Sequence, residues 1–177
     1  MGSQPLVVVM GISGVGKSAV GHELADRFGL EYADGDDFHP KANIHKMATG
    51  HPLTDEDRWP WLHAIGGWLA EHDEAGGVIS CSALRRVYRD ILVEAAPRTA
   101  FLHLYGDHDL IRSRIENRKG HFMPASLLTS QEETLEQLES DENGFAIDIT
   151  PSVAEIVDSF LLKAGIDKTG LAGKAPS

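Results

Sequence analysis

The sequence predicts an α/β fold of three layers, αβα, with a central parallel sheet of about five strands. Two observations support this prediction. Short, β-branched apolar runs alternate along the chain with patterns of helical period, which is typical of parallel sheets with right-handed crossovers. The first run, residues 5–10, is continuously apolar and ends at a glycine, as a strand buried on both faces does.

The apolar runs predict where the strands lie. The five runs are residues 6–10, 30–33, 77–81, 100–105 and 145–149. The first helix is predicted over residues 17–28, because apolar side chains recur there at every fourth position. Gly29 is placed to end this helix.

Capping residues predict the helices that follow. Thr54 with Asp57 resembles a capping box in which Asp replaces the usual Glu or Gln. Ser82 is expected to cap a helix over 85–95, and Asp107 one over 110–118. A stretch of glutamates with a thin apolar stripe, residues 131–142, is expected to form a solvated helix.

Length and charge limit the possible functions. The 177 residues, 42% of them hydrophobic, suit one domain, which we expect over residues 1–164 with a flexible tail over 165–177. The net charge of -11 disfavours nucleic acids and anionic membranes as partners, and no apolar run approaches the ~20 residues of a membrane helix. A single cysteine, Cys81, and the absence of a recognisable signal peptide indicate a cytoplasmic protein.

A phosphate-binding loop stands between the first strand and the first helix. Gly11-x-x-x-x-Gly16-Lys17-Ser18 matches the P-loop pattern, in which glycines let backbone N–H groups surround a phosphate. Lys17 would supply charge to the β and γ phosphates and Ser18 a Mg²⁺ ligand. The residues expected to bind ATP here are Gly11, Ser13, Gly14, Val15, Gly16, Lys17, Ser18 and Ala19.

Three carboxylates follow the second strand, at the sheet edge where ligands bind in open α/β folds. They are Asp34, Asp36 and Asp37. One of them could orient an acceptor hydroxyl and take its proton, a role that we assign to Asp36. Because the third strand ends without an aspartate, Asp34 is our candidate for the second Mg²⁺ ligand. The alternative interpretation is a solvated acidic turn.

Four further segments resemble the gluconate kinases, a family of P-loop small-molecule kinases with the fold of adenylate and shikimate kinases. The segments are 34–40 (DGDDFHP), 43–62 (NIHKMATGHPLTDEDRWPWL), 81–90 (CSALRRVYRD) and 118–122 (RKGHF). The resemblance covers about residues 6–138. The chain differs from the family's pattern in the acidic residue after Asp36 and in the Met-Pro-Ala-Ser run that follows the last motif. Pro124 in this run could alter how the lid hinges.

The resemblance implies transfer of the γ-phosphoryl group of ATP, with Mg²⁺, to the 6-hydroxyl of D-gluconate, and it raises the possibility of a homodimer. A cation is needed for the gluconate carboxylate, and short polar groups for its hydroxyls. The candidate cations are Arg58, Arg85, Arg86 and Arg89, and the candidate hydroxyl-binding residues are Asp36, His39, Asn43 and Ser82. Arg85 and Arg89, four residues apart, would share a helical face.

A basic stretch before a glycine predicts a mobile lid at about residues 119–130. Closure of a lid shields the transferring group from water. Arg114 and Arg118 would face the nucleotide, and Arg118 would stabilise charge on the transferred group. Lys119 and His121 are assigned to substrate binding.

Two alternatives remain open from the sequence. One is a kinase for another small acceptor, such as shikimate or a nucleoside monophosphate. The other is a nucleotide-dependent switch that hydrolyses ATP slowly and has no small acceptor.

Overall fold

A computed structural model of the chain describes residues 4–117 and 125–166. The strands are β1 (Leu6–Met10), β2 (Tyr32–Asp34), β3 (Gly77–Ser80), β4 (Ala100–Tyr105) and β5 (Gly144–Asp148). The helices are α1 (Lys17–Phe28), the 3-10 helix η1 (Gly35–Phe38), α2 (Lys41–Ala48), α3 (Asp55–Glu71), α4 (Arg86–Ala95), α5 (His108–Glu116), α6 (Ala125–Thr134) and α7 (Val153–Ala164).

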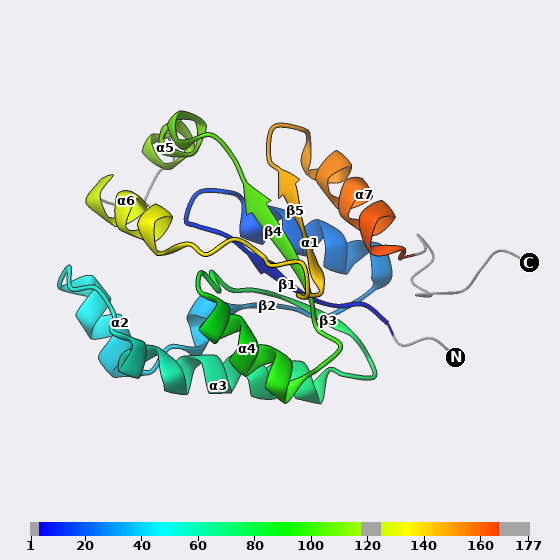
Figure 1. Ribbon diagram of the computed structural model, residues 1–177, viewed down its shortest axis with the longest axis horizontal. Helices are drawn as coiled ribbons and strands as arrows, with labels where there is room; N and C mark the ends of the chain where they lie inside the picture. Colours follow the sequence, from blue (N-terminus) through cyan, green and yellow to red (C-terminus); the bar gives the residue numbers. More distant parts are fainter. Residues whose placement is uncertain (1–3, 118–124, 167–177) are drawn as a thin grey trace, which may run out of the picture.

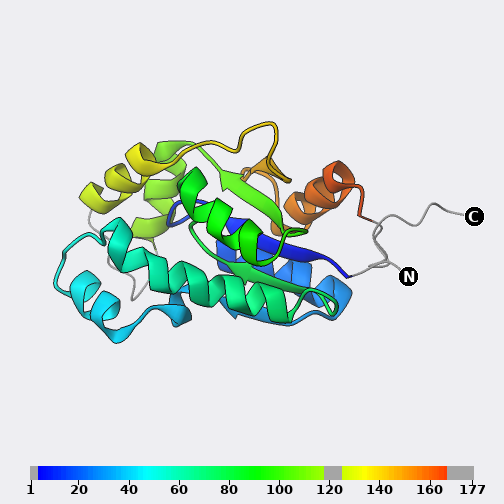
Figure 2. The same cartoon turned by 60° about the horizontal axis from the view of Figure 1, so that its bottom comes forward.

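The strands form one five-stranded parallel sheet, as the sequence predicted, and their order is β2-β3-β1-β4-β5. Helices α1 and α7 cover one face, and α3 and α4 cover the other, which gives the predicted three layers (Figures 1 and 2). The carboxyl ends of the strands point to the end of the molecule where α2, α5 and α6 lie (Figure 1). Among the described residues, no helix is long and apolar enough to cross a membrane.

The alternation of side chains along β1 builds both halves of the core. Val7 and Val9 join the cluster that contains Leu24 of α1. Val8 points to the other face, where it packs in a cluster with Leu62 of α3. A strand that is apolar at every position is therefore buried on both sides, which explains the uninterrupted run in the sequence.

Most capping predictions are confirmed. Gly29 ends α1 with a left-handed backbone, φ 63°. Thr54 and Asp57 form a complete capping box on α3, and Asp107 accepts a hydrogen bond from Asp109 N at the start of α5. The cap predicted at Ser82 is wrong, because α4 begins only at Arg86 and has Arg85 as an N-cap without a side-chain hydrogen bond.

The helix predicted over 131–142 is also wrong, since α6 ends at Thr134. Beyond that point the backbone bonds elsewhere: Glu136 N donates to the Leu84 carbonyl at 2.7 Å. Leu138 packs against the α3–α4 core. Because the Glu136 N–H donates to Leu84, it is not available for the hydrogen bond to residue 132 that would continue the helix. Half of the predicted lid, residues 119–124, and nearly all of the predicted tail, residues 167–177, lie outside the described residues; residues 125–130 of the predicted lid belong to α6.

Candidate active site

The phosphate loop has the backbone that its glycines permit. Gly11, Gly14 and Gly16 have φ values of 145°, 87° and 90°. A Cβ on Gly11 would lie 2.7 Å from the Leu104 carbonyl oxygen, and one on Gly14 2.7 Å from Ile115, so packing excludes larger residues. A Cβ on Gly16 would meet nothing within 4 Å. The loop is therefore packed against the protein at its first half and open at Gly16, at the N-terminus of α1, where a phosphate fits.

Two side chains hold the loop. The Lys17 ammonium donates to the carbonyls of Gly11 at 2.8 Å and Ile12 at 3.0 Å. The Ser13 N–H donates to Oε1 of Gln131 on α6 at 2.7 Å. Gln131 was not predicted, because a single glutamine 118 positions away from Ser13 forms no recognisable pattern with it.

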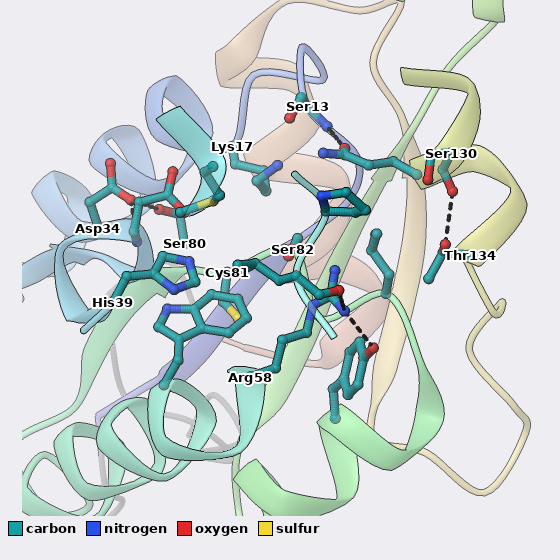
Figure 3. Close-up of a pocket in the computed structure, with 18 of the residues that line it drawn as sticks. Ser13, Lys17, Asp34, His39, Arg58, Ser80, Cys81, Ser82, Ser130 and Thr134 are labelled. Carbon is teal, nitrogen blue, oxygen red and sulfur yellow. Dashed lines mark hydrogen bonds between the residues drawn. The ribbon is translucent and has the colours of Figure 1, made fainter. Parts of the chain in front are cut away.

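A cavity of about 270 Å³ opens beside the loop. Figure 3 shows Lys17, Asp34 and His39 on one side of it and Ser130 and Thr134 of α6 on the opposite side. The polar lining residues are Ser13, Lys17, Asp34, Asp36, His39, His51, Arg58, Ser80, Ser82, Tyr88, Ser130, Gln131 and Thr134. The fold thus gathers the predicted loop, acidic cluster and Ser82 around one space, as the parallel topology requires.

The two acidic residues at the end of β2 lie in different environments. Asp34 caps η1 by accepting a hydrogen bond from Asp36 N at 2.9 Å, and the Ser80 hydroxyl lies 3.4 Å from the same oxygen. The pKa of Asp36 is raised, first because the cleft removes part of its hydration and second because Asp34 is negative. Lys17 partly offsets this rise. A carboxylate with a raised pKa near phosphates is suited to accept a proton.

His39 is a neutral ring held in place. It stacks on Trp61 with 4.2 Å between ring centroids. Burial and the nearby Arg58 lower the pKa of His39 to about 4. Asn43, predicted to bind substrate, is buried and does not line the cavity; its amide nitrogen donates to the Asp57 carbonyl at 2.8 Å and lies 3.2 Å from His39 Nδ1. We infer that Asn43 orients His39.

Of the four candidate arginines, only Arg58 lines the cavity. Its Nη1 donates to the Leu53 carbonyl at 2.8 Å and to the Tyr88 hydroxyl at 3.3 Å. Its guanidinium also lies 5.5 Å from the centre of the Tyr88 ring. Tyr88 in turn donates to Asp55, which binds Arg85 at 2.6 Å in a neighbouring depression.

Arg86 and Arg89 are occupied by ion pairs. Arg86 binds Glu139 and Asp141 at the surface. Arg89 is fully buried, donates twice to Glu142 at 2.6 and 3.1 Å, and donates to the Ala83 carbonyl. The predicted shared helical face of Arg85 and Arg89 is wrong, because Arg85 is an extended N-cap residue outside the helix.

Oxygen ligands for Mg²⁺ are available at the predicted positions. Ser18 lies in the first turn of α1 next to Lys17, and Asp34 lines the cavity. A hydroxyl and a carboxylate are the hard ligands that Mg²⁺ prefers, usually with waters and substrate phosphates. No group of three or more His, Cys, Asp or Glu that could bind a metal occurs in the described part of the chain.

The remaining predicted residues fall into two groups. Arg114, on α5, donates to the Ile149 carbonyl at 3.4 Å, just beyond β5. Arg118, Lys119 and His121 lie outside the described residues, so their assigned roles stay predictions. Ala19 is exposed in the first turn of α1.

Comparisons with known proteins agree with this arrangement. The shikimate kinase family model matches residues 13–155. The chain is 43% identical over 157 residues to the thermoresistant gluconokinase of Escherichia coli, covering 87% of this chain and 90% of that one. It is 48% identical over 145 residues to a gluconokinase of Gluconobacter oxydans, covering 80% and 82%. The crystal structure of a gluconokinase from Sinorhizobium meliloti superposes with a TM-score of 0.84 at 47% identity, covering 93% of each chain.

Proposed function

Because the chain belongs to the gluconokinase family of ATP-dependent kinases, we propose that it transfers the terminal phosphoryl group of Mg²⁺-ATP to the 6-hydroxyl of D-gluconate. The observation that carries the proposal is the shared cavity of the phosphate loop, the acidic pair Asp34 and Asp36, and one arginine, Arg58. This set matches two substrates bound side by side, one that carries phosphates and one that carries a carboxylate.

Each side chain has a role that follows from its surroundings. The loop N–H groups and Lys17 would hold the phosphates. Ser18 and Asp34 would hold Mg²⁺, which would supply positive charge beside the phosphates. Asp36 accepts the proton of the acceptor hydroxyl while the new O–P bond forms and the bond to ADP breaks. Arg118 or Lys119, from the basic stretch of the predicted lid, would stabilise the charge of the transferred group.

Arg58 is the best-placed partner for the gluconate carboxylate. Its contacts to Leu53 and Tyr88 use Nη1, and a planar guanidinium has further donors for a bidentate contact. Neutral His39 and the hydroxyl of Ser82 suit the sugar hydroxyls, because they can donate or accept without a fixed charge. We place the reaction in the cytoplasm, where ATP is supplied.

The test is coupled ADP release with Mg²⁺-ATP and D-gluconate, shikimate, glycerate, AMP or no acceptor. We expect strong stimulation by gluconate alone, with ³¹P NMR of the product showing a phosphomonoester on the terminal carbon. Equal or greater stimulation by another acceptor would refute gluconate as the substrate. Slow ADP release that no acceptor changes would favour the nucleotide switch.

A further inference from the structure

Gln131 reaches from α6 to the phosphate loop. Its Oε1 accepts the Ser13 N–H at 2.7 Å. Because a backbone N–H can only donate, this contact fixes which end of the amide is the oxygen. The Gln131 NH₂ group is then the other end, and it makes no hydrogen bond within the described residues. A side chain that lines the cavity thus offers it an unused neutral donor.

The position of Gln131 is set by the fold. Leu128, one turn earlier on α6, is 2% exposed in the α1–α7 core. One residue after Gln131, Glu132 accepts from His108 at the start of α5 at 2.5 Å. Just beyond the helix, Glu136 N is bonded to the Leu84 carbonyl. Contacts to the rest of the fold therefore hold the last turn of α6 in place before and after Gln131.

Gln131 also shares its cavity with the groups that handle the phosphates and the acceptor. The same cavity is lined by Lys17 and Ser13 from the loop and by Asp34 and Asp36 from the end of β2. Phosphoryl transfer needs donors aimed at the equatorial oxygens of the moving group, already oriented before the reaction. Because the Gln131 oxygen is already bonded to the loop, its NH₂ group needs little reorganisation to donate a hydrogen bond to that group.

We propose that Gln131 is a catalytic residue of the transfer: its Oε1 stays on Ser13 while its NH₂ group donates to the transferring phosphoryl group. The assignment rests on the proposed kinase function. A glutamine suits the position better than a carboxylate, because a second negative charge would repel the phosphoryl oxygens.

Two variants separate the parts of this role. Gln131→Glu keeps an oxygen for Ser13 but loses the donor, and Gln131→Met keeps the shape without either. We expect both to lower kcat about 10²- to 10³-fold, the usual effect of removing one such donor. In Gln131→Met, KM for ATP and gluconate should stay within about threefold, because the contact strengthens in the transition state. Gln131→Glu should also raise KM for ATP, because its carboxylate repels the phosphates. Glu133→Gln, an exposed residue two positions later on α6, is the matched control and should keep wild-type kcat.

A purely structural role would give a different result. It would lower the unfolding midpoint of Gln131→Met, whereas we expect an unchanged midpoint together with the loss of kcat. If wild type turns over gluconate and Gln131→Met keeps kcat within about threefold, the proposal is refuted.

A second measurement does not depend on the acceptor. Mg²⁺-ADP with aluminium fluoride imitates the transferring group, and we expect Gln131→Met to bind it about tenfold more weakly, with unchanged affinity for Mg²⁺-ADP alone. Equal affinity of wild type and variant for the fluoride complex would overturn the role of Gln131. Failure of wild type to use any acceptor would instead overturn the proposed function, and the fluoride binding would still decide on Gln131.

Discussion

Asp36 illustrates how neighbours set the chemistry of a single carboxyl group. The Asp34 carboxylate accepts a hydrogen bond from the Asp36 backbone N–H, so the two acidic groups are held close together, and the cleft limits hydration of Asp36. Both effects disfavour a second negative charge, while Lys17 favours it. The raised pKa that results makes Asp36 a stronger base than a solvated aspartate.

Asp36→Asn should lower kcat about 10²- to 10⁴-fold with little change in KM for ATP, because the amide cannot take the proton. In wild type, kcat/KM should rise with pH through the raised pKa of Asp36, so the acid limb lies above the range of an ordinary aspartate. The variant should lack that limb. A pH series of ADP release measures both effects, with Asp37→Asn as control, because Asp37 does not line the cavity. The control should keep the acid limb, moved slightly to lower pH, because the charge of Asp37 contributes to the raised pKa of Asp36. An acid limb that persists in Asp36→Asn would assign the base elsewhere.

The sequence predicted those site residues that lie in a continuous motif. Lys17 belongs to the loop pattern, and Asp34 and Asp36 follow directly after a strand, so local spacing was sufficient. Gln131 could not be found, because its place depends on where α6 docks. The sequence could not show that Arg89 pairs with Glu142 and does not line the cavity, because an arginine in such a motif looks the same whether it faces a ligand or a buried carboxylate.

At the scale of elements, a buried ion pair fastens α4 to the segment before β5. Arg89 is 0% exposed, and its side chain donates to both oxygens of Glu142. Removing these two charges from water costs free energy, and the close, well-aligned hydrogen bonds between them compensate for that cost. Removing one partner leaves the other charge buried without compensation.

Arg89→Met should reduce the free energy of unfolding by about 3–5 kcal/mol, and the double variant with Glu142→Met should recover much of the loss. Urea unfolding of the two single variants and the double variant forms the cycle that measures the coupling. The folded Arg89→Met protein should keep its KM for gluconate, because Arg89 does not line the cavity. A raised KM with unchanged stability would instead support the substrate-binding role that the sequence suggested.

The capping box of α3 positions the helix that carries Arg58 and Trp61. Thr54→Ala removes the hydroxyl that accepts from Asp57 N and should cost about 1 kcal/mol of unfolding free energy. Thr54→Ser keeps the oxygen and should cost much less. Urea midpoints of the two variants give the comparison, and equal losses would show that the hydroxyl does not act as a cap.

Many elements with strong local signals were predictable, and those fixed by docking were not. Buried strands and capped helices such as α1, α3 and α5 followed from periodicity and caps. The helices α2, α6 and α7 were missed, although the capping box of Ser152 and Glu155 at the start of α7 is a local signal that could have been used. In α2, Ile44 and Met47 are exposed and only Asn43 is buried, so no core-facing stripe marks the helix. The end of α6 is set by the long-range bond from Glu136 to Leu84.

For the whole molecule, buried histidines couple stability to pH. His39 and His103 have pKa values lowered to about 4, mainly by burial, so the unfolded chain binds their protons more readily than the folded protein. Stability from this source is complete above pH 6.5 and is lost as the pH falls toward 4. His72 acts in the opposite direction: its pKa is raised beside Glu31, so its contribution is present below pH 6.5 and is lost as the pH rises.

His103 offers the cleanest test of this coupling. It is 0% exposed on β4, and neither ring nitrogen has a hydrogen-bond partner among the described residues. His103→Leu should therefore match or exceed wild-type stability at pH 7, because an apolar group replaces unsatisfied polar atoms.

Below pH 6.5 the advantage of His103→Leu should grow, because only the wild type must keep this ring neutral in the folded state. One proton corresponds to about 1.4 kcal/mol per pH unit, so at pH 5 the variant should gain about 2 kcal/mol relative to the difference at pH 7. Urea unfolding of both proteins between pH 7 and 5 measures this gain, and ¹⁵N NMR of the wild-type imidazole should give a pKa near 4. Parallel pH curves for the two proteins would mean that His103 titrates alike in the folded and unfolded states, so that burial on β4 is not what controls its charge.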